Sequence, residues 1–234
     1  MDEFRAALVA ALGLIANGDQ DLMAIVSRSL LVSLSAVGLA TLVGLPLGAL
    51  VAVWRFPGRA FVRALLNALM GLPPVVVGLV LYLLLSRSGP LGGFGLLYTP
   101  TAMILAQWVL ITPIIAALTR QTVADLYVEY AEQLHSLGVG PWHTLWTLLW
   151  DGRFSLLTAV LAGFGRASAE VGAVLIVGGN INHVTRVMTT TIALETSKGD
   201  LPLALGLGMI LLLLTLLLNI TAMAIQDVTK RLYG

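Results

Sequence analysis

The sequence contains no cysteine, so neither disulfides nor thiolate metal sites contribute to its fold or chemistry. Charged side chains are scarce: they make up 11% of the residues, against 58% for hydrophobic ones. A soluble domain carries about 25% charged residues, so this composition excludes an ordinary soluble protein. The formal net charge of +1 offers no strongly basic surface for nucleic acid. The sequence also lacks a phosphate-binding loop of the form G-x-x-x-x-G-K-[ST], so it carries no such ATP-binding motif.

What the sequence has instead is long apolar runs, and about 20 apolar residues suffice to cross a bilayer core as a helix. Four runs carry no charge, and a fifth, Phe154–Gly178, is interrupted by Arg166 and Glu170. The uncharged runs are Ser29–Trp54, Ala64–Ser86, Leu97–Thr119 and Leu201–Gln226. The sequence therefore predicts an all-α membrane protein with a bundle of five transmembrane helices.

The N-terminal apolar run, Ala6–Ala16, has 11 residues, which is short for a span. Two acidic residues precede it, where a signal peptide has Lys or Arg. We expect residues 1–23 to form an amphipathic helix at the membrane interface, and a sixth span is the alternative. The rest of the chain divides into a transmembrane domain, residues 24–228, and a cytoplasmic C-terminal tail, residues 229–234.

The distribution of Lys and Arg predicts the orientation, because cytoplasmic loops carry an excess of these residues. With the N-terminus outside and the C-terminus inside, seven of them lie in the cytoplasm and five outside. The densest group is "RFPGRAFVR" at residues 55–63. In this orientation residues 120–153 face the cytoplasm and residues 179–200 face the other side.

A polar segment, residues 120–153, separates the third apolar run from the one that contains Arg166, although a connection needs only a few residues. Val123–Leu137 predicts a helix that Gly138 ends, and Pro141 suits the first position of a second helix. That second helix places four apolar residues on one face: Trp142, Leu145, Trp146 and Leu149. We name residues 123–152 the elbow. A plain connection with its Trp face on the membrane is the alternative.

The elbow resembles the Glu-Ala-Ala loop of permease subunits of type I ATP-binding-cassette importers, in which a coupling helix docks on the ATPase subunit. Glu132, Leu137 and Gly138 match that motif, whereas Gln133 and Leu134 replace its two alanines. The resemblance implies that the elbow contacts a separate ATPase through Glu129, Glu132, Leu137, Gly138, Pro141 and Trp142.

Three further stretches resemble the oxyanion permeases for molybdate, sulfate and tungstate. They are "GLPPVVVGL" (71–79), "GFGRASAEVGAVLIVGGNI" (163–181) and "TRVMTTTIALETSKGD" (185–200), the last most like the tungstate branch. The resemblance implies a transport subunit, not an enzyme, that translocates a tetrahedral oxyanion, with tungstate first. The alternatives are the same machine for molybdate or sulfate, and a secondary transporter, which typically shows inverted repeats.

The same resemblance implies partners and a location. Two copies form a homodimer with two cytoplasmic ATPase subunits, which bind ATP and Mg²⁺, and with a periplasmic or lipid-anchored oxyanion-binding protein. The assembly lies among the lipids of a bacterial or archaeal cytoplasmic membrane. This chain itself is expected to hold no cofactor or metal and no nucleic acid.

The charges inside the fifth run are candidates for the translocation pathway. Arg166 and Glu170 are four residues apart, so within one helix they share a face. Arg166 lies about 18 Å along that helix from its start, near mid-membrane, where an unpaired charge costs roughly 2.5–3.5 kcal/mol. Arg166 would attract an anion and Glu170 would moderate the attraction; a purely structural pair is the alternative. Pro73 and Pro74 break the second run, either to line the pathway or only as a packing kink.

Small residues in the fifth run predict close helix approach. We expect Gly163, Gly165 and Gly172 to mark a homodimer interface, with Gly165 and Gly172 on one face and Arg166 near the symmetry axis. Downstream, Val184–Ser197 predicts an amphipathic outer helix that either seats a binding protein or caps the pathway.

Overall fold

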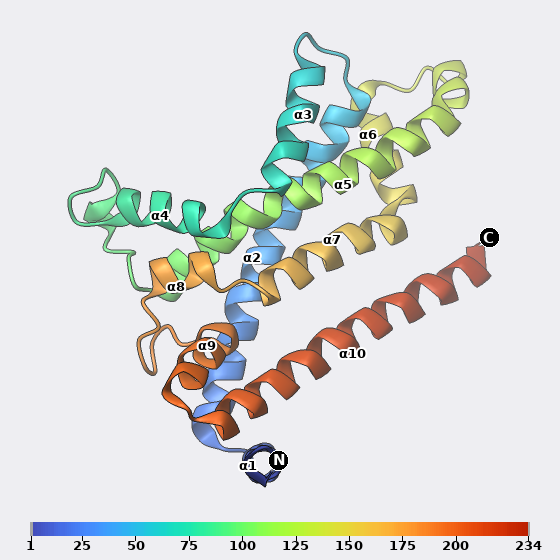
Figure 1. Cartoon of the computed structure of the whole chain (residues 1–234). Helices are drawn as coiled ribbons and strands as arrows, with labels where there is room; N and C mark the ends of the chain where they lie inside the picture. The colour runs from blue at the N-terminus through green and yellow to red at the C-terminus, as the bar shows by residue number, and fades with distance from the viewer. Residues whose placement is uncertain (1, 234) are drawn as a thin grey trace. The chain divides into compact units, whose positions relative to one another are not determined.

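The apolar runs of the sequence fold into helices (Figure 1). The computed structural model describes the backbone of residues 2–233 and the side chains of residues 5–221, 223 and 224. Every regular element in this range is helical, which confirms the all-α prediction. The elements are α1 (Asp2–Ala16), α2 (Gln20–Val53), α3 (Arg59–Met70), α4 (Pro74–Leu85), the 3₁₀ turn η1 (Gly92–Phe94), α5 (Pro100–Ser136), α6 (Pro141–Asp151), α7 (Arg153–Ser168), α8 (Gly172–Gly178), α9 (Met188–Lys198) and α10 (Leu201–Tyr233).

Among the described residues, three helices are long and apolar enough to cross a membrane by themselves: α2, α5 and the first 21 residues of α10. Two interrupted pairs, α3 with α4 and α7 with α8, meet the same criteria when each pair counts as one span. The total is then up to five, in agreement with the predicted bundle. The predicted tail, residues 229–234, falls mostly on the last turns of α10, whose side chains lie outside the described set.

The first interruption lies at the predicted proline pair. Pro73 has an extended backbone (φ −66°, ψ 121°), and Pro74 is the first residue of α4. A residue that precedes proline avoids the helical region, and neither proline has an N–H to donate, so a continuous helix cannot pass this point. The two prolines therefore separate two helices.

The second interruption corrects the prediction of one helix over Phe154–Gly178. Helix α7 ends at Ser168 and α8 begins at Gly172, so Glu170 lies in the connection. Polar groups take the helical hydrogen bonds at this point: Oε1 of Glu170 accepts the N–H of Ala173 at 2.9 Å, and the Glu170 carbonyl accepts the hydroxyl of Thr189 at 2.8 Å. The prediction that Arg166 and Glu170 share a helix face was wrong, because only Arg166 is on α7.

The contacts within the chain define two compact units. The first unit contains the residues up to 36 together with 73–107 and 167–217. The second unit contains 37–72, 108–166 and the residues from 218 on. Each unit is described by itself.

The first unit has its apolar centre where α2, α9 and α10 meet, around the buried residues Leu22, Ile25, Met188 and Leu207. Helix α1 joins this unit through Ala11, which is fully buried. Asp19 begins α2, since its Oδ1 accepts the N–H of Leu22 at 2.9 Å, as expected of an N-terminal cap. Helix α1 is therefore a separate helix that packs into the first unit, and its position at the membrane interface stays a prediction.

The second unit depends on close contact between α2 and α5. A Cβ atom added at Gly48 would lie 2.7 Å from Cβ of Thr119 and 2.9 Å from the backbone nitrogen of Arg120, and it would also collide with the carbonyl oxygen of Ala116. Gly38, on the same helix, has no such neighbour within 4 Å. The absence of a side chain at Gly48 therefore permits the approach of the two helices.

We predict that Gly48→Ala destabilises the protein, because the new methyl group meets backbone atoms of α5 that cannot move aside singly. Overpacking of this kind costs roughly 1–3 kcal/mol. Thermal unfolding in detergent, followed by circular dichroism, measures the effect. Gly38→Ala is the matched control and should leave the melting temperature unchanged or raise it, since Ala favours helix over Gly. Equal melting temperatures for the two variants would show that the contact at Gly48 is not tight.

Candidate functional site

The elbow grows directly out of a membrane helix in the second unit. Helix α5 runs without interruption over 37 residues, so the predicted helix Val123–Leu137 is the end of α5 and not a separate element. At 1.5 Å per residue α5 is about 55 Å long, whereas the hydrocarbon core is about 30 Å thick. The polar end of α5 therefore projects well beyond the membrane, and its movement is coupled to that of the span.

The turn of the elbow has the geometry that the glycines predict. Gly138 has a φ of +65°, a left-handed conformation that favours glycine. Its N–H bonds the carbonyl of His135 and the N–H of Val139 bonds the carbonyl of Leu134, both at 3.1 Å, which closes the end of α5. Gly140 is extended and Pro141 starts α6. The predicted stop and restart are confirmed.

Helix α6 packs onto the second unit through one face. Leu145 and Leu148 are 1% and 0% exposed, and they belong to an apolar cluster shared by α2, α5, α6 and α7. We call this group the elbow cluster: Ala49, Ala52, Val53, Val123, Leu145, Leu148 and Leu156. The predicted single face of α6 is therefore divided, because Leu145 is buried while Trp142 and Trp146 are 56% and 62% exposed.

The opposite side of the elbow is exposed. All six residues predicted to contact an ATPase lie on this surface or at its turn, and Leu137 is 76% exposed. Trp142 also stacks edge-to-face on Trp54, with 5.0 Å between ring centroids, which fixes the start of α6 against the end of α2. The predicted contact residues are Glu129, Glu132, Leu137, Gly138, Pro141 and Trp142. We call residues 137–142 the elbow tip.

A second group of candidate residues lies in the first unit, where α4 begins beside α8. A Cβ atom at Gly172 would lie 3.0 Å from Cγ2 of Val75 and 3.7 Å from Oε1 of Glu170. Further along, a Cβ at Gly78 would lie 2.8 Å from Cα of Ala173. The starts of α4 and α8 are thus in close contact, and this unit brings together three of the predicted pathway residues: Pro73, Pro74 and Glu170.

Buried polar groups surround this contact. Glu170 is 2% exposed, and Gln107 on α5 is 3% exposed and donates from Nε2 to the carbonyl of Ala167 at 3.1 Å. The Oε1 atom of Gln107 has no hydrogen-bond partner within the described residues. The sequence did not lead us to Gln107 as a candidate residue, although a single amide in the middle of an uncharged apolar run could have indicated a buried polar group. Arg166, half-buried on the last turn of α7, belongs to the second unit.

The glycines of the fifth run do not form the predicted common face. Gly165 lies on α7 and Gly172 begins α8, and only Gly165 has space beside it, with no atom within 4 Å of an added Cβ. The Cβ position of Gly163 is filled by Ile111 and Ile115 of α5 at 2.8–3.1 Å. The break at residues 169–171 is the reason that Gly165 and Gly172 are separated.

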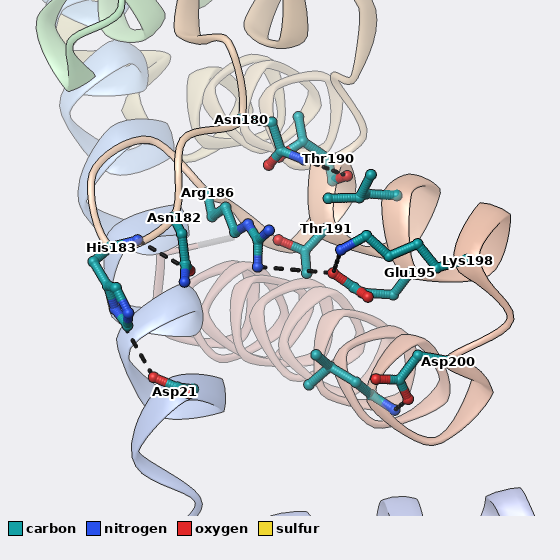
Figure 2. Close-up of polar contacts among 12 residues, drawn as sticks. Asp21, Asn180, Asn182, His183, Arg186, Thr190, Thr191, Glu195, Lys198 and Asp200 are labelled. Carbon is teal, nitrogen blue, oxygen red and sulfur yellow. Dashed lines mark hydrogen bonds and ion pairs between the residues drawn. The ribbon is translucent and has the colours of Figure 1, made fainter.

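A cluster of charges in the first unit was also missed (Figure 2). Glu195 on α9 is 4% exposed, and its Oε1 lies 3.0 Å from Nζ of Lys198 and 3.7 Å from Nη1 of Arg186. Arg28 on α2 donates to the carbonyls of Arg186 and His183 at 3.2 and 3.0 Å, which ties the loop before α9 to α2. The three-residue spacing of Glu195 and Lys198 was the available signal.

The predicted outer helix is α9, shifted to Met188–Lys198. Its threonines hold the loop in place: Thr189 bonds the carbonyl of Glu170, and Thr191 bonds the carbonyl of Val187 at 2.8 Å. Thr190 bonds Oδ1 of Asn180 at 2.9 Å (Figure 2). These hydroxyls point inward, so α9 supports the connection that contains Glu170. Whether α9 seats a binding protein or caps a pathway stays a prediction.

The chain resembles known membrane proteins over nearly all of the elements described above. Residues 44–232 match the family described as "binding-protein-dependent transport system inner membrane component". A probable anion ABC transporter permease protein of Haloferax volcanii is 41% identical over 192 residues, which is 79% of this chain and 83% of that protein. The tungstate uptake system permease protein of Peptoclostridium acidaminophilum is 38% identical over 218 residues, 93% of this chain and 96% of that protein.

A second tungstate uptake system permease protein, from Campylobacter jejuni, is 37% identical over 190 residues, 81% of this chain and 80% of that protein. The matched family region contains the elbow, both helix interruptions and the charge cluster of α9. The family relation and the membrane-length helices make this a multi-pass inner-membrane protein. The chain belongs to the family of inner-membrane permease components of binding-protein-dependent transport systems.

Proposed function

We propose that this chain is the permease subunit of an ATP-driven importer that carries a tetrahedral oxyanion, with tungstate as the first candidate, across the cytoplasmic membrane. Support for the anion comes from relatives that cover most of the chain and are named for anion or tungstate transport. Molybdate and sulfate have the same shape and charge, so they are the second candidates. ATP hydrolysis takes place on two separate ATPase subunits that bind ATP and Mg²⁺.

The observation that carries the proposal is the way the elbow is attached. Its tip is exposed, while Leu145 and Leu148 behind it are buried among residues of α2, α5 and α7. A partner that pushes on the tip thus moves three membrane helices, because close-packed side chains transmit displacement. An interfacial connection would need neither an exposed, ordered tip nor a buried cluster beneath it.

Two copies of the chain surround one pathway in this proposal, with one ATPase below each elbow and an oxyanion-binding protein on the opposite side. The N-terminus lies outside and the C-terminus in the cytoplasm. This orientation puts the elbow and the arginines around residue 59 on the same side. Arg59 donates to the carbonyls of Val51 and Ala52 and so closes the C-terminal end of α2.

Arg166, Glu170, Pro73 and Pro74 line the pathway in this account. The two helix interruptions remove backbone groups from the helical hydrogen-bond pattern, and such irregular backbone occurs at membrane depth where it is buried in protein or lines a cavity. Arg166 attracts the anion, and Glu170 limits its residence by repulsion. Tight binding in the membrane is not required when a separate binding protein captures the substrate.

We predict that the reconstituted permease, with its ATPase and binding protein, takes up tungstate in an ATP-dependent way, and that Gly138→Pro weakens this uptake. Proline cannot adopt the positive φ of Gly138, and strain of this kind costs roughly 1–3 kcal/mol. This free energy shifts the equilibrium between the docked and the undocked elbow by a factor of roughly five to 150. Uptake is measured by elemental analysis of the vesicles, and coupling by the ATPase rate.

Gly140→Ala is the matched control for the turn, since Gly140 has an ordinary φ of −68° and open space for a Cβ. It should keep coupling, whereas Glu132→Arg, which reverses an exposed charge beside the tip, should weaken it. Wild-type coupling in both Gly138→Pro and Glu132→Arg would remove the elbow from the mechanism. Uptake of sulfate or molybdate in place of tungstate would reassign the substrate and leave the transport class intact.

We predict that Glu170→Gln retains the fold and lowers the rate of anion uptake. Its amide oxygen can still accept the N–H of Ala173, whereas the loss of the negative charge prolongs the stay of the anion near Arg166. Glu170→Ala should instead lower the stability by about 1–3 kcal/mol, because the buried N–H of Ala173 loses its acceptor. Thr189→Val is the control that breaks the same network without a change of charge. Wild-type uptake by Glu170→Gln would make the role of Glu170 structural only.

We predict that cysteine at residue 165 forms a disulfide between two copies in oxidised membranes, because Gly165 is the glycine of α7 with open space beside it. Cysteine at residue 163 is the matched control, since Ile111 and Ile115 cover that position. The chain has no native cysteine, so each variant carries a single thiol. The dimer interface lies elsewhere if cysteine at 165 stays monomeric while exposed positions of α10, such as 213, cross-link.

A further inference from the structure

An open apolar groove lies in the second unit, beside the base of the elbow. It has a volume of about 500 Å³ and is bounded by α2, the end of α6 and the first half of α7. Most of its lining side chains are aliphatic: Leu42, Leu45, Pro46, Leu149, Leu157 and Val160. Thr41 also lines the groove, and its hydroxyl oxygen is buried. A groove of this composition offers few polar groups along its length, so its occupant must present a mainly hydrocarbon surface.

The two ends of the groove differ in chemistry. The end nearest the elbow carries Trp146, Trp150 and Arg153, and the other end reaches Leu42 on α2 and Val160 on α7. Arg153 and Val160 are seven residues apart on one helix, so the groove extends about 10 Å into the span. This length fits within one leaflet, since the whole hydrocarbon core is about 30 Å thick. The groove is therefore amphipathic in the same direction as a lipid molecule.

Arg153 is fixed at the polar end. Its guanidinium lies 4.8 Å from the ring centroid of Trp150 and 4.4 Å from that of Phe154, and Nη1 donates to the carbonyl of Trp150 at 2.6 Å. A guanidinium has five N–H donors, and a pair of them matches two phosphate oxygens. The nearby carboxylate of Asp151 faces Tyr130 on α5, and a hydrogen bond to it raises the pKa of that phenol. The groove thus presents a held cation with further donors at its mouth.

The two tryptophans strengthen this assignment. Trp146 and Trp150 are 62% and 72% exposed, and they lie one helical turn apart at the mouth of the groove. Exposed tryptophans are typical of the level of the lipid headgroups, where the ring meets hydrocarbon and the indole N–H meets polar groups. Along the groove, Arg153 corresponds to the phosphate of a lipid, the two tryptophans to its glycerol region and the aliphatic walls to its acyl chain.

We propose that this groove is the binding site of an anionic phospholipid of the leaflet on the elbow side, with one acyl chain between α2 and α7 and its phosphate on Arg153. A second copy of the chain is the rival occupant, but the combination of one cation, two exposed tryptophans and an aliphatic groove matches a lipid along its whole length. The lipid site lies between α6, α2 and α7, so it connects these helices in a second place besides the elbow cluster. The bound lipid therefore holds the base of the elbow in place. The proposal rests on the membrane location of the chain and does not depend on the transported substrate.

The test uses fluorescence quenching of Trp146 and Trp150 by brominated lipid. Trp54, Trp108 and Trp142 are replaced by Phe, and the protein is reconstituted in vesicles of phosphatidylcholine with one part in five of phosphatidylglycerol. Bromine is placed on the acyl chains of one lipid at a time, at equal mole fraction. Because one cationic side chain near the surface contributes about 1 kcal/mol toward anionic lipid, we expect about a fivefold preference for phosphatidylglycerol.

Two substitutions locate the preference. Arg153→Gln should abolish it, whereas Arg63→Gln, at an exposed arginine of α3 away from the groove, should leave it unchanged. Val160→Phe fills the hydrocarbon end and should reduce quenching by both lipids; because it leaves Arg153 intact, it keeps the proposal testable should Arg153→Gln fail to fold. Competition by unbrominated phosphatidylglycerol should restore the fluorescence.

Three results would overturn the proposal. Equal quenching by the two lipids in the parent protein would show that no anionic headgroup is selected. An equal loss of preference in Arg63→Gln and Arg153→Gln would assign the effect to general surface charge. Weak quenching that increases on dilution of the protein into more lipid would identify a second copy of the chain as the occupant.

Discussion

The burial of Leu145 and Leu148 beneath α6 is the interaction on which the proposed coupling depends. These two side chains fasten α6 to α2, α5 and α7, and the cost of removing such a buried side chain is about 2–5 kcal/mol. Without them α6 would be a loose connection, and a partner acting on the elbow tip would only bend it. With them, the exposed tip and the spans form one mechanical body within the second unit. The left-handed Gly138 and the Trp54–Trp142 contact then fix the direction in which the tip points.

In the first unit, helices are interrupted inside an apolar protein, and the backbone groups at each interruption need hydrogen-bond partners. Glu170, Thr189 and Gln107 supply the missing partners around the break at residues 169–171, and Pro73 and Pro74 remove donors at the neighbouring break. A carboxylate that serves this purpose is already positioned inside the membrane domain. The same group can therefore influence an anion without an additional charge having to be buried.

The sequence predicted what local chemistry decides. Uncharged runs identified the spans, Gly138 and Pro141 identified the turn of the elbow, and the proline pair identified the first helix break. The sequence did not predict that α5 continues through residue 123. A segment outside the membrane is polar whether it continues the membrane helix or starts a new one, so its polarity does not distinguish the two. The sequence also failed at Glu170 and Glu195, whose buried positions depend on partners such as Thr189 and Arg186 that tertiary structure brings close. Sequence spacing alone placed Arg166 and Glu170 on one helix face, but α7 ends at Ser168, and the Glu170 carboxylate and carbonyl bond Ala173 and Thr189 instead.

The most direct test of this account asks whether the elbow and its helices move as one body. Spin labels at Thr147 on α6 and Phe61 on α3, both exposed in the second unit, report the distance within one copy when labelled chains are diluted with unlabelled ones. A single label at Thr147 in the assembled importer reports the distance between the two elbows. On trapping the ATPases with ATP and vanadate, the account predicts a change of the distance between elbows and no change within a copy. A change within the copy, with the spans unmoved, would contradict it.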